Sequence, residues 1–223
     1  MYKSIDMSTL KANPKFRWFV ERENFLSQKE CDDLKKVIDT QSIRQNGYYK
    51  DTRRKDAAQE LANALDTENI ENNLKEKVIN DIVMGDHEHQ SACVINITKL
   101  DDSKLLDKFW MALKLSNMQY WNYDIRGIYR NRVQAHRYDV GDHYLPHADF
   151  HWMDDHSTTK LTCIIFLNDD YEGGEFKFFD DHIIKPSAGK LLIHPSLAGH
   201  EVMPVTKGAR YSCVAWGVGD TFV

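Results

Sequence analysis

The tripeptide His147, Ala148, Asp149 places an imidazole and a carboxylate two residues apart. In an extended strand, residues i and i+2 point to the same side, so both groups could face one point. His200, in the segment "SLAGHEVMPV", is the best candidate for a third ligand, because a turn there could bring it to a strand edge. Two histidines and one carboxylate leave open positions on a metal and are typical of non-haem Fe(II) oxygenases. The sequence therefore predicts an iron site formed by these three residues.

A helical metal site is the alternative arrangement of the same region. His143, His147 and His151 have the i, i+4, i+8 spacing of a helix face. However, Gly141 and Pro146 interrupt any helix there, and the sequence has no HExxH pattern. The helical site is therefore excluded. Structural, supporting or solvated roles are predicted for the other nearby histidines: His136, His143, His151 and His194.

Arg210 follows His200 in the segment "HEVMPVTKGAR". Two strands joined by the turn "TKGA" would return its guanidinium to the depth of the metal site. A planar guanidinium matches a carboxylate with two parallel hydrogen bonds. The alternative is an ordinary surface arginine, and the position after His200 favours a ligand-binding role.

Three segments of the N-terminal half have the periodicity of amphipathic helices. The first, residues 27–38, begins with Ser27 and Glu30 in the pattern of a capping box. The second covers residues 57–65, and the third covers residues 103–121. Between the second and third, residues 91–98 read as a strand.

From about residue 128 the pattern changes to short strands separated by turns rich in Gly and Asp. The expected strands are "IYRNRVQAHRY", "LTCIIFL", "GEFKFF", "GKLLIHP", "HEVMPV" and "RYSCVAWGV". Short strands with such turns indicate an antiparallel sandwich or jelly roll. We therefore expect one α+β domain over residues 1–223. Residues 1–127 form a mainly helical support, and residues 128–220 form the jelly-roll core with the metal site.

Composition narrows the class of protein. The chain has 223 residues, 42% of them hydrophobic, which is enough for a substantial core. Its net charge of −5 disfavours a general nucleic-acid binder, which needs a basic face. Its four cysteines are far apart, and neither a signal peptide nor an apolar membrane span is visible. These features predict a cytoplasmic protein with reduced thiols.

Longer segments around these residues resemble a known family. The segments are "VQAHRYDVGDHYLPHADF", "KLTCIIFLNDDYEGGEFKFF" and "KPSAGKLLIHPSLAGHEVMPVTKGARYSCVAWG". They resemble the 2-oxoglutarate/Fe(II) dioxygenases of the prolyl 4-hydroxylase type, and in particular the PKHD-type hydroxylases of bacteria and phages. The resemblance covers roughly residues 90–220 and implies a double-stranded β-helix, which is a jelly roll, buttressed by N-terminal helices.

The resemblance also implies roles for individual residues. His147, Asp149 and His200 correspond to the iron ligands. Arg210 corresponds to the residue that holds the distal carboxylate of 2-oxoglutarate, where many prolyl hydroxylases have lysine. The implied co-substrate pocket also contains Tyr138, which hydrogen-bonds 2-oxoglutarate, with Thr162 and Phe166 on the lining strand and Trp216 as a wall of the barrel.

The implied activity is hydroxylation of an unactivated C–H bond with O2, yielding succinate and CO2. Fe(II) is the implied cofactor, 2-oxoglutarate the co-substrate and ascorbate a candidate reductant. The expected substrate is peptidyl proline, and the expected location is the cytoplasm of a bacterium or a phage-infected cell. Segment 40–60 could cover the site, and the expected substrate contacts are Tyr48, Tyr49, Tyr144 and Trp152.

Three other functions stay open at this point. One is hydroxylation of a free amino acid or another small molecule. A second is nucleic-acid demethylation, but demethylases of the superfamily carry a second arginine where Trp216 stands here. The third is a metal-binding jelly roll without catalysis, against which the retention of three ligands and Arg210 argues.

Overall fold

The computed structural model describes residues 15–47, 93–100, 102–152 and 157–221 of the chain. Two compact units make up the chain: residues 1–44 with 95–223 form the first, and residues 45–94 form the second. The candidate site lies in the first unit. The predicted helix at residues 57–65 lies outside the described residues. The single domain over residues 1–223 stays a prediction.

Helix α1 (Gln28–Gln41) begins as the sequence predicts. The Ser27 side chain accepts a hydrogen bond from the backbone of Glu30, and the Glu30 carboxylate accepts one from the backbone of Ser27. This capping box satisfies two backbone N–H groups that a helix start leaves without partners. Cys31 and Ile38 occupy its buried face.

Helix α4 (Ser103–Ser116) continues into a π-helical turn, η3 (Asn117–Trp121). Asp102 caps its start by accepting from the backbone of Leu105. Asn122 ends it in the left-handed conformation, with φ 55°. The helix predicted at residues 103–121 is therefore present. Among the described residues, no helix is sufficiently long and apolar to cross a membrane.

The strands form one large sheet and one small sheet. The large sheet has the order β1-β11-β7-β14-β5-β3-β6-β12-β9-β10, with β2 beside β3 and β4 beside β14, and β13 pairs with β8 in the small sheet. The pairs β1–β11, β11–β7, β14–β5 and β13–β8 are antiparallel. Their bounds are β1 (Val20–Arg22), β2 (Ile43–Gly47), β3 (Cys93–Leu100), β4 (Gly127–Ile128), β5 (Val133–Tyr138), β6 (His143–His147), β7 (Ser157–Phe166), β8 (Glu172–Gly173), β9 (Phe176–Phe178), β10 (Ile183–Ile184), β11 (Leu191–Pro195), β12 (His200–Val202), β13 (Val205–Lys207) and β14 (Arg210–Asp220).

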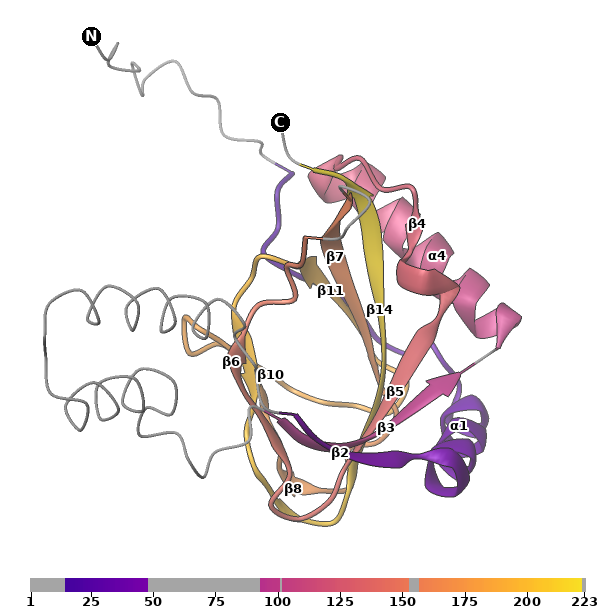
Figure 1. The fold of residues 1–223 in the computed structure, drawn as a ribbon, viewed down its shortest axis with the longest axis vertical. Coiled ribbons are helices and arrows are strands. Elements are labelled where there is room, and N and C mark those ends of the chain that lie inside the picture. Colours follow the sequence, from indigo (N-terminus) through magenta and orange to yellow (C-terminus); the bar gives the residue numbers. More distant parts are fainter. Residues whose placement is uncertain (1–14, 48–92, 101, 153–156, 222–223) are drawn as a thin grey trace, which may run out of the picture. The chain divides into compact units, whose positions relative to one another are not determined.

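This sheet curls into the expected jelly roll. Figure 1 shows the long strands β5, β14 and β7 facing β6 and β10 across the interior, with α1 and α4 on the outer side of the long strands. The sequence prediction of an α+β jelly roll buttressed by N-terminal helices is therefore confirmed. The described part of region 1–127 contributes strands as well as helices, and β3 enters the sheet between β5 and β6.

One predicted strand is interrupted. The sequence suggested a continuous strand over "IYRNRVQAHRY", but a 3-10 turn, η4 (Tyr129–Asn131), separates β4 from β5. Arg130 and Asn131 both have positive φ angles, of 54° and 48°. Left-handed residues cannot continue a strand, so the chain turns between β4 and β5.

Alternation along the central strands gives the fold two hydrophobic cores. In β7, Cys163 and Ile165 belong to the core shared with α4, where Phe109 and Leu113 are fully buried. The intervening Ile164 and Phe166 belong to a second core inside the jelly roll. Successive residues of a strand point to opposite faces, so one strand serves both cores. The inner core leaves a cavity, and the candidate site lies along its wall.

Candidate metal centre

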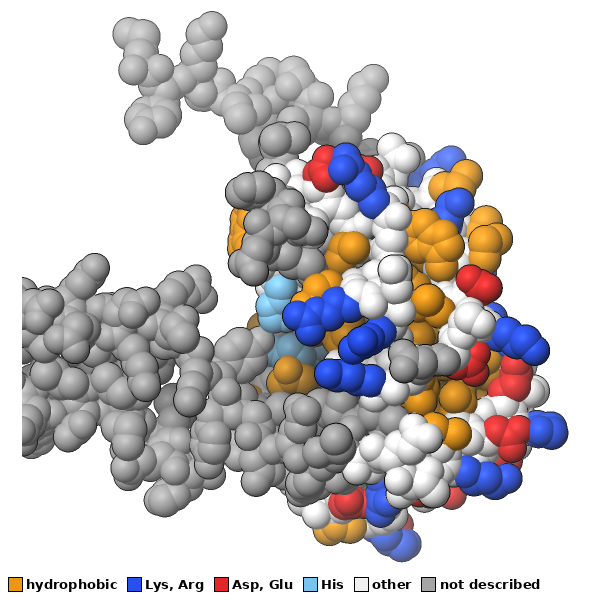
Figure 2. Space-filling view, turned by 45° about the vertical axis from the view of Figure 1, so that its right-hand side comes forward, with side chains coloured by type: hydrophobic (Ala, Val, Ile, Leu, Met, Phe, Trp, Pro, Cys, Tyr) orange, Lys and Arg blue, Asp and Glu red, His pale blue; other side chains and the backbone are white. Residues whose placement is uncertain are grey.

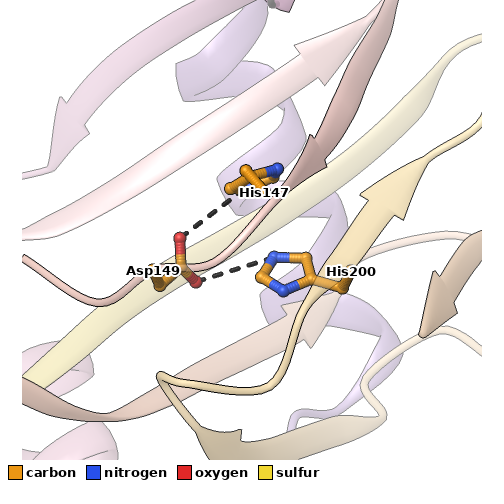
Figure 3. Close-up of side chains that lie close together, drawn as sticks. All are labelled: His147, Asp149 and His200. Carbon is orange, nitrogen blue, oxygen red and sulfur yellow. Dashed lines mark ion pairs between the residues drawn. The ribbon is translucent and has the colours of Figure 1, made fainter. Parts of the chain in front are cut away.

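Strand pairing brings the two predicted histidine ligands together. His147 is the last residue of β6, His200 is the first residue of β12, and the two stand opposite each other in the antiparallel pair. Asp149 lies two residues beyond the end of β6. The carboxylate therefore reaches the site from the segment after the strand, and not from the same strand face as predicted. Figure 3 shows the three side chains converging, with the carboxylate facing both rings.

The distances suit a single metal ion. Nε2 of His147 lies 3.6 Å from Oδ1 of Asp149, and Nε2 of His200 lies 3.7 Å from Oδ2. One potential ligand atom from each residue lies within 4.8 Å of the others. Metal–nitrogen and metal–oxygen bonds of about 2 Å are compatible with such separations. The donor set of two imidazoles and one carboxylate fits Fe(II) with open positions.

Backbone carbonyl groups set the orientation of both imidazoles. Nδ1 of His147 lies 2.7 Å from the carbonyl oxygen of Leu145, and Nδ1 of His200 lies 3.0 Å from that of Ala198. A carbonyl oxygen only accepts, so each Nδ1 carries the proton and donates it. In the neutral ring, Nε2 then presents its lone pair toward the carboxylate. In metal-binding histidines, a hydrogen bond of this kind commonly fixes both the tautomer and the orientation of the ring.

One hydroxyl group holds the Asp149 carboxylate, and a second hydroxyl contacts the first. Thr162 donates a hydrogen bond to Oδ2 of Asp149 at 2.9 Å, and its hydroxyl lies 3.1 Å from that of Ser196. Burial alone would raise the pKa of Asp149, but the His200 and His147 imidazoles and the Thr162 hydroxyl lower it. The carboxylate is thus kept ionised for a cation. The sequence predicted that Thr162 lies on the strand lining the co-substrate pocket. In the structure its hydroxyl contacts Asp149, one of the three candidate metal ligands.

Arg210 lies in the same cavity as the triad. The cavity has a volume of about 680 Å³ and is lined by His147, Asp149 and His200 as well as by Arg210 and Tyr138. Arg210 is only 1% exposed, so the alternative of a surface arginine is wrong. It stands opposite Tyr138 in the pairing of β14 with β5.

Not all N–H donors of the Arg210 guanidinium have a hydrogen-bond partner. Nη1 donates to the hydroxyl of Ser212 at 3.1 Å, and the guanidinium lies 4.9 Å from the Tyr138 ring centre and 5.3 Å from that of Phe166. Its Nε is buried without a hydrogen-bond partner, and within the described parts of the chain Arg210 forms no ion pair. A buried cation without a counter-ion is costly, which makes this end of the cavity a site for an anion.

The predicted substrate residues are partly located. The Tyr144 ring stacks on His147, with ring centres 3.8 Å apart, and it lines the cavity. Trp152 also lines the cavity and is 66% exposed, with its ring edge-on to Phe150. Tyr48, Tyr49 and most of segment 40–60 lie outside the described residues.

Two residues of β5 that line the cavity, Gln134 and His136, were assigned no binding role from the sequence. They line it together with Tyr138 of β5 and Trp216 of β14, whose roles the sequence analysis did predict. Their i, i+2 spacing on strands was the signal that could have identified them. The cavity also includes Tyr129 and Arg130 from the turn before β5. That turn was read as strand, so its residues could not have been placed from the pattern.

Three buried histidines should make the metal-free fold sensitive to acid. Burial is the main cause that lowers the pKa of His136 to about 3, of His147 to about 4 and of His194 to about 3. In the unfolded chain these groups titrate near pH 6.5. Below that pH the unfolded state binds more protons, so the free energy of unfolding should fall as pH falls from about 6.5 toward 4. The slope is at most about 1.4 kcal/mol per pH unit for each histidine.

Urea unfolding between pH 4.5 and 7.5, with a chelator present, measures this slope. His194→Phe should flatten it, because the phenyl ring joins Phe176 and Phe178 beside that position and does not titrate. The matched control His182→Gln removes an exposed histidine that contributes to none of these three pKa shifts, and it should leave their share of the slope unchanged. Equal slopes for the wild type and His194→Phe would contradict the assignment.

The sequence of this region is similar to those of known proteins. Residues 133–217 match the family described as the 2OG-Fe(II) oxygenase superfamily. A PKHD-type hydroxylase from Janthinobacterium sp. (strain Marseille) is 37% identical over 90 residues, covering 36% of this chain and 40% of that protein. A PKHD-type hydroxylase from Xylella fastidiosa (strain M12) is 39% identical over 94 residues, covering 36% and 41%. The chain thus matches about 40% of the length of these curated relatives.

Solved structures share its fold. A viral collagen prolyl hydroxylase from Paramecium Bursaria Chlorella virus-1, in a 2OG complex, has a TM-score of 0.58 at 17% identity and covers 92% of this chain and 97% of its own. A Trichoplax adhaerens prolyl hydroxylase in complex with a hypoxia inducible factor peptide fragment has a TM-score of 0.59 at 18% identity, covering 92% and 84%. The metal triad and the jelly roll agree with this likeness, and residues 133–217 are thus similar to the 2OG-Fe(II) oxygenase superfamily.

Proposed function

We propose that the chain is an Fe(II)- and 2-oxoglutarate-dependent dioxygenase that hydroxylates proline residues in peptides. One observation carries the proposal. A triad suited to a metal and a buried arginine without a counter-ion line the same cavity. A ligand that chelates a metal at one end and carries a carboxylate at the other would satisfy both, and 2-oxoglutarate is such a molecule.

His147, Asp149 and His200 would hold Fe(II), with Thr162 and the two carbonyl contacts fixing their orientation. Fe(II) and 2-oxoglutarate, when bound, would supply with O2 an oxidative decarboxylation that yields succinate and CO2, with the second oxygen atom of O2 going to the C–H bond. The protein contributes ligand geometry, a dry pocket and the position of the substrate.

Arg210 would hold the distal carboxylate of 2-oxoglutarate. Its guanidinium is buried against the Tyr138 and Phe166 rings, which exclude water from the contact. Charge-assisted hydrogen bonds are strong where neither partner is solvated. The Tyr138 hydroxyl would be a further contact for the co-substrate.

The walls of the cavity favour a peptidyl proline as substrate. Tyr129, Tyr144, Trp152 and Trp216 give the cavity several aromatic faces. Such faces bury an apolar ring while their polar edges remain available for the peptide. Two structurally similar proteins support the choice, since one is a collagen prolyl hydroxylase and the other is a prolyl hydroxylase with a bound peptide fragment.

Succinate release tests the proposal. Protein loaded with Fe(II) should convert 2-oxoglutarate to succinate slowly in air with ascorbate present. Peptides that contain proline should raise the rate several-fold and gain one oxygen atom, as detected by mass spectrometry. The matched control peptide, with alanine in place of proline, should do neither. If no proline peptide stimulates the reaction while a free amino acid or a nucleobase does, the proposed substrate is wrong and the dioxygenase proposal stands.

A further inference from the structure

We propose that Arg130 makes the enzyme selective for peptides that carry an acidic residue beside the target proline. Its guanidinium would bind the Asp or Glu carboxylate of the substrate. This inference rests on the proposed function, and it concerns the end of the cavity that the co-substrate does not use.

Arg130 lines the cavity, and its guanidinium has no carboxylate partner among the described residues. It is exposed and lines the cavity that holds the triad, along with Trp152 and Tyr144. Its guanidinium carbon lies 4.9 Å from the centre of the Tyr129 ring, which positions the group while leaving its N–H donors available. In the parts of the chain that the structure describes, no carboxylate pairs with it. Arg130 therefore has hydrogen-bonding capacity for a substrate carboxylate.

The backbone of Arg130 adopts the left-handed conformation, which is unfavourable for arginine. Arg130 has φ 54° and ψ 17°, and Asn131 follows with φ 48°. Asparagine tolerates the left-handed region, but arginine there costs about 1 kcal/mol or more. Strained residues of this kind gather at ligand-binding sites, where the strain fixes a side chain. At this position, the turn interrupts the strand and places the guanidinium at the cavity wall.

The charges around the cavity favour an anionic substrate. Arg130 and Arg210 both line it, and Asp149 is the only carboxylate among its described lining residues. Since Asp149 is assigned to the metal and Arg210 to the co-substrate, the charge that remains for the second substrate is that of Arg130. Figure 2 shows Lys and Arg side chains beside the histidines on this face, with the acidic side chains further away. Such an arrangement attracts and orients anions.

Arg130 and Arg210 lie toward opposite ends of β5. Arg210 stands opposite Tyr138 at the end of β5, whereas Arg130 precedes the start of β5. Gln134 and Tyr138 alone are roughly 13 Å apart at a rise of about 3.3 Å per residue. 2-Oxoglutarate bound at Arg210 therefore leaves Arg130 for the second substrate.

Paired peptides test the selectivity. Each pair differs only in Glu or Gln next to the proline, on its N-terminal or C-terminal side, with both peptide ends blocked. For the wild type, kcat/KM for the best Glu peptide should exceed that for its Gln partner by about two- to fivefold, the upper part of the range for an exposed charge pair. The advantage should shrink as salt is added, because the pair is open to solvent.

Three variants assign the effect to the guanidinium. Arg130→Gln should abolish the preference, and so should Arg130→Gly, which keeps the left-handed backbone without strain. Arg130→Glu should favour the peptide with Lys in place of Glu. The matched control Arg132→Gln removes an exposed arginine of the same turn that does not line the cavity, and it should keep the preference.

Binding of the same peptides to the Mn(II)-loaded and 2-oxoglutarate-loaded protein, followed by calorimetry, gives a readout that does not need turnover. Acid-selective binding that disappears in Arg130→Gln supports the inference even if no peptide is hydroxylated, which would reject only the proposed substrate. Equal binding of the Glu and Gln peptides would overturn it. Equal losses in Arg130→Gln and Arg132→Gln would do the same.

Discussion

Replacing Asp149 by alanine should lower Fe(II)-dependent succinate formation by more than about 100-fold, beyond the 10- to 100-fold losses typical of residues that only support metal ligands. The carboxylate is the sole anionic donor of the triad and faces both Nε2 atoms at 3.6 Å and 3.7 Å. Its removal leaves two neutral imidazoles, which bind a divalent cation weakly. Succinate measured by chromatography, with and without added Fe(II), gives the rate.

Thr162 offers a graded control for this prediction. Thr162→Val keeps the shape of the side chain but removes the hydrogen bond to Oδ2 of Asp149. It should cost about 10- to 100-fold, and Thr162→Ser should retain most of the activity. Circular dichroism of each variant checks that the fold is intact. An Asp149→Ala protein that is folded and turns over 2-oxoglutarate at the wild-type rate would overturn the metal assignment.

Replacing Arg210 by glutamine should raise the KM for 2-oxoglutarate by about 100-fold, while Fe(II) binding stays near the wild-type level. Two charge-assisted hydrogen bonds in a buried pocket together contribute about 3 kcal/mol, which corresponds to that factor. Arg210→Lys should recover part of the affinity, since an ammonium supplies the charge without the planar pair of donors. Initial rates over a range of 2-oxoglutarate concentrations separate KM from kcat.

Stability measurements distinguish this role from a structural one. Because Arg210 is buried without a counter-ion in the described structure, Arg210→Met should leave the free energy of unfolding unchanged or raise it. A structural arginine would instead give a strongly destabilised protein. An unchanged KM for 2-oxoglutarate in Arg210→Gln would contradict the proposed co-substrate contact.

The sequence by itself determined the features that depend on local pattern. Ser27 and Glu30 predicted the start of α1, because a capping box involves residues three apart. The periodicity of residues 103–121 predicted α4 and its extension for the same reason. The types and order of His147, Asp149 and His200 indicated the metal chemistry, since ligand identity is a property of the residues themselves.

Only the tertiary structure decided how these groups meet. The pairing of β6 with β12 sets His200 opposite His147, and its register depends on contacts between distant segments. Thr162 could be assigned to Asp149 only when β7 was placed beside the site. Burial of Arg210 follows from the pairing of β14 with β5 and β7, which no local pattern records.

The turn at Arg130 shows the same limit within a short segment. Its residues have ordinary strand-like neighbours, and the sequence pattern predicted a continuous strand. The left-handed conformation of Arg130 and Asn131 is unfavourable locally and persists because the surrounding fold stabilises it. Local propensity therefore placed the strands, while the packing of the whole jelly roll decided where one of them breaks and which side chains line the cavity.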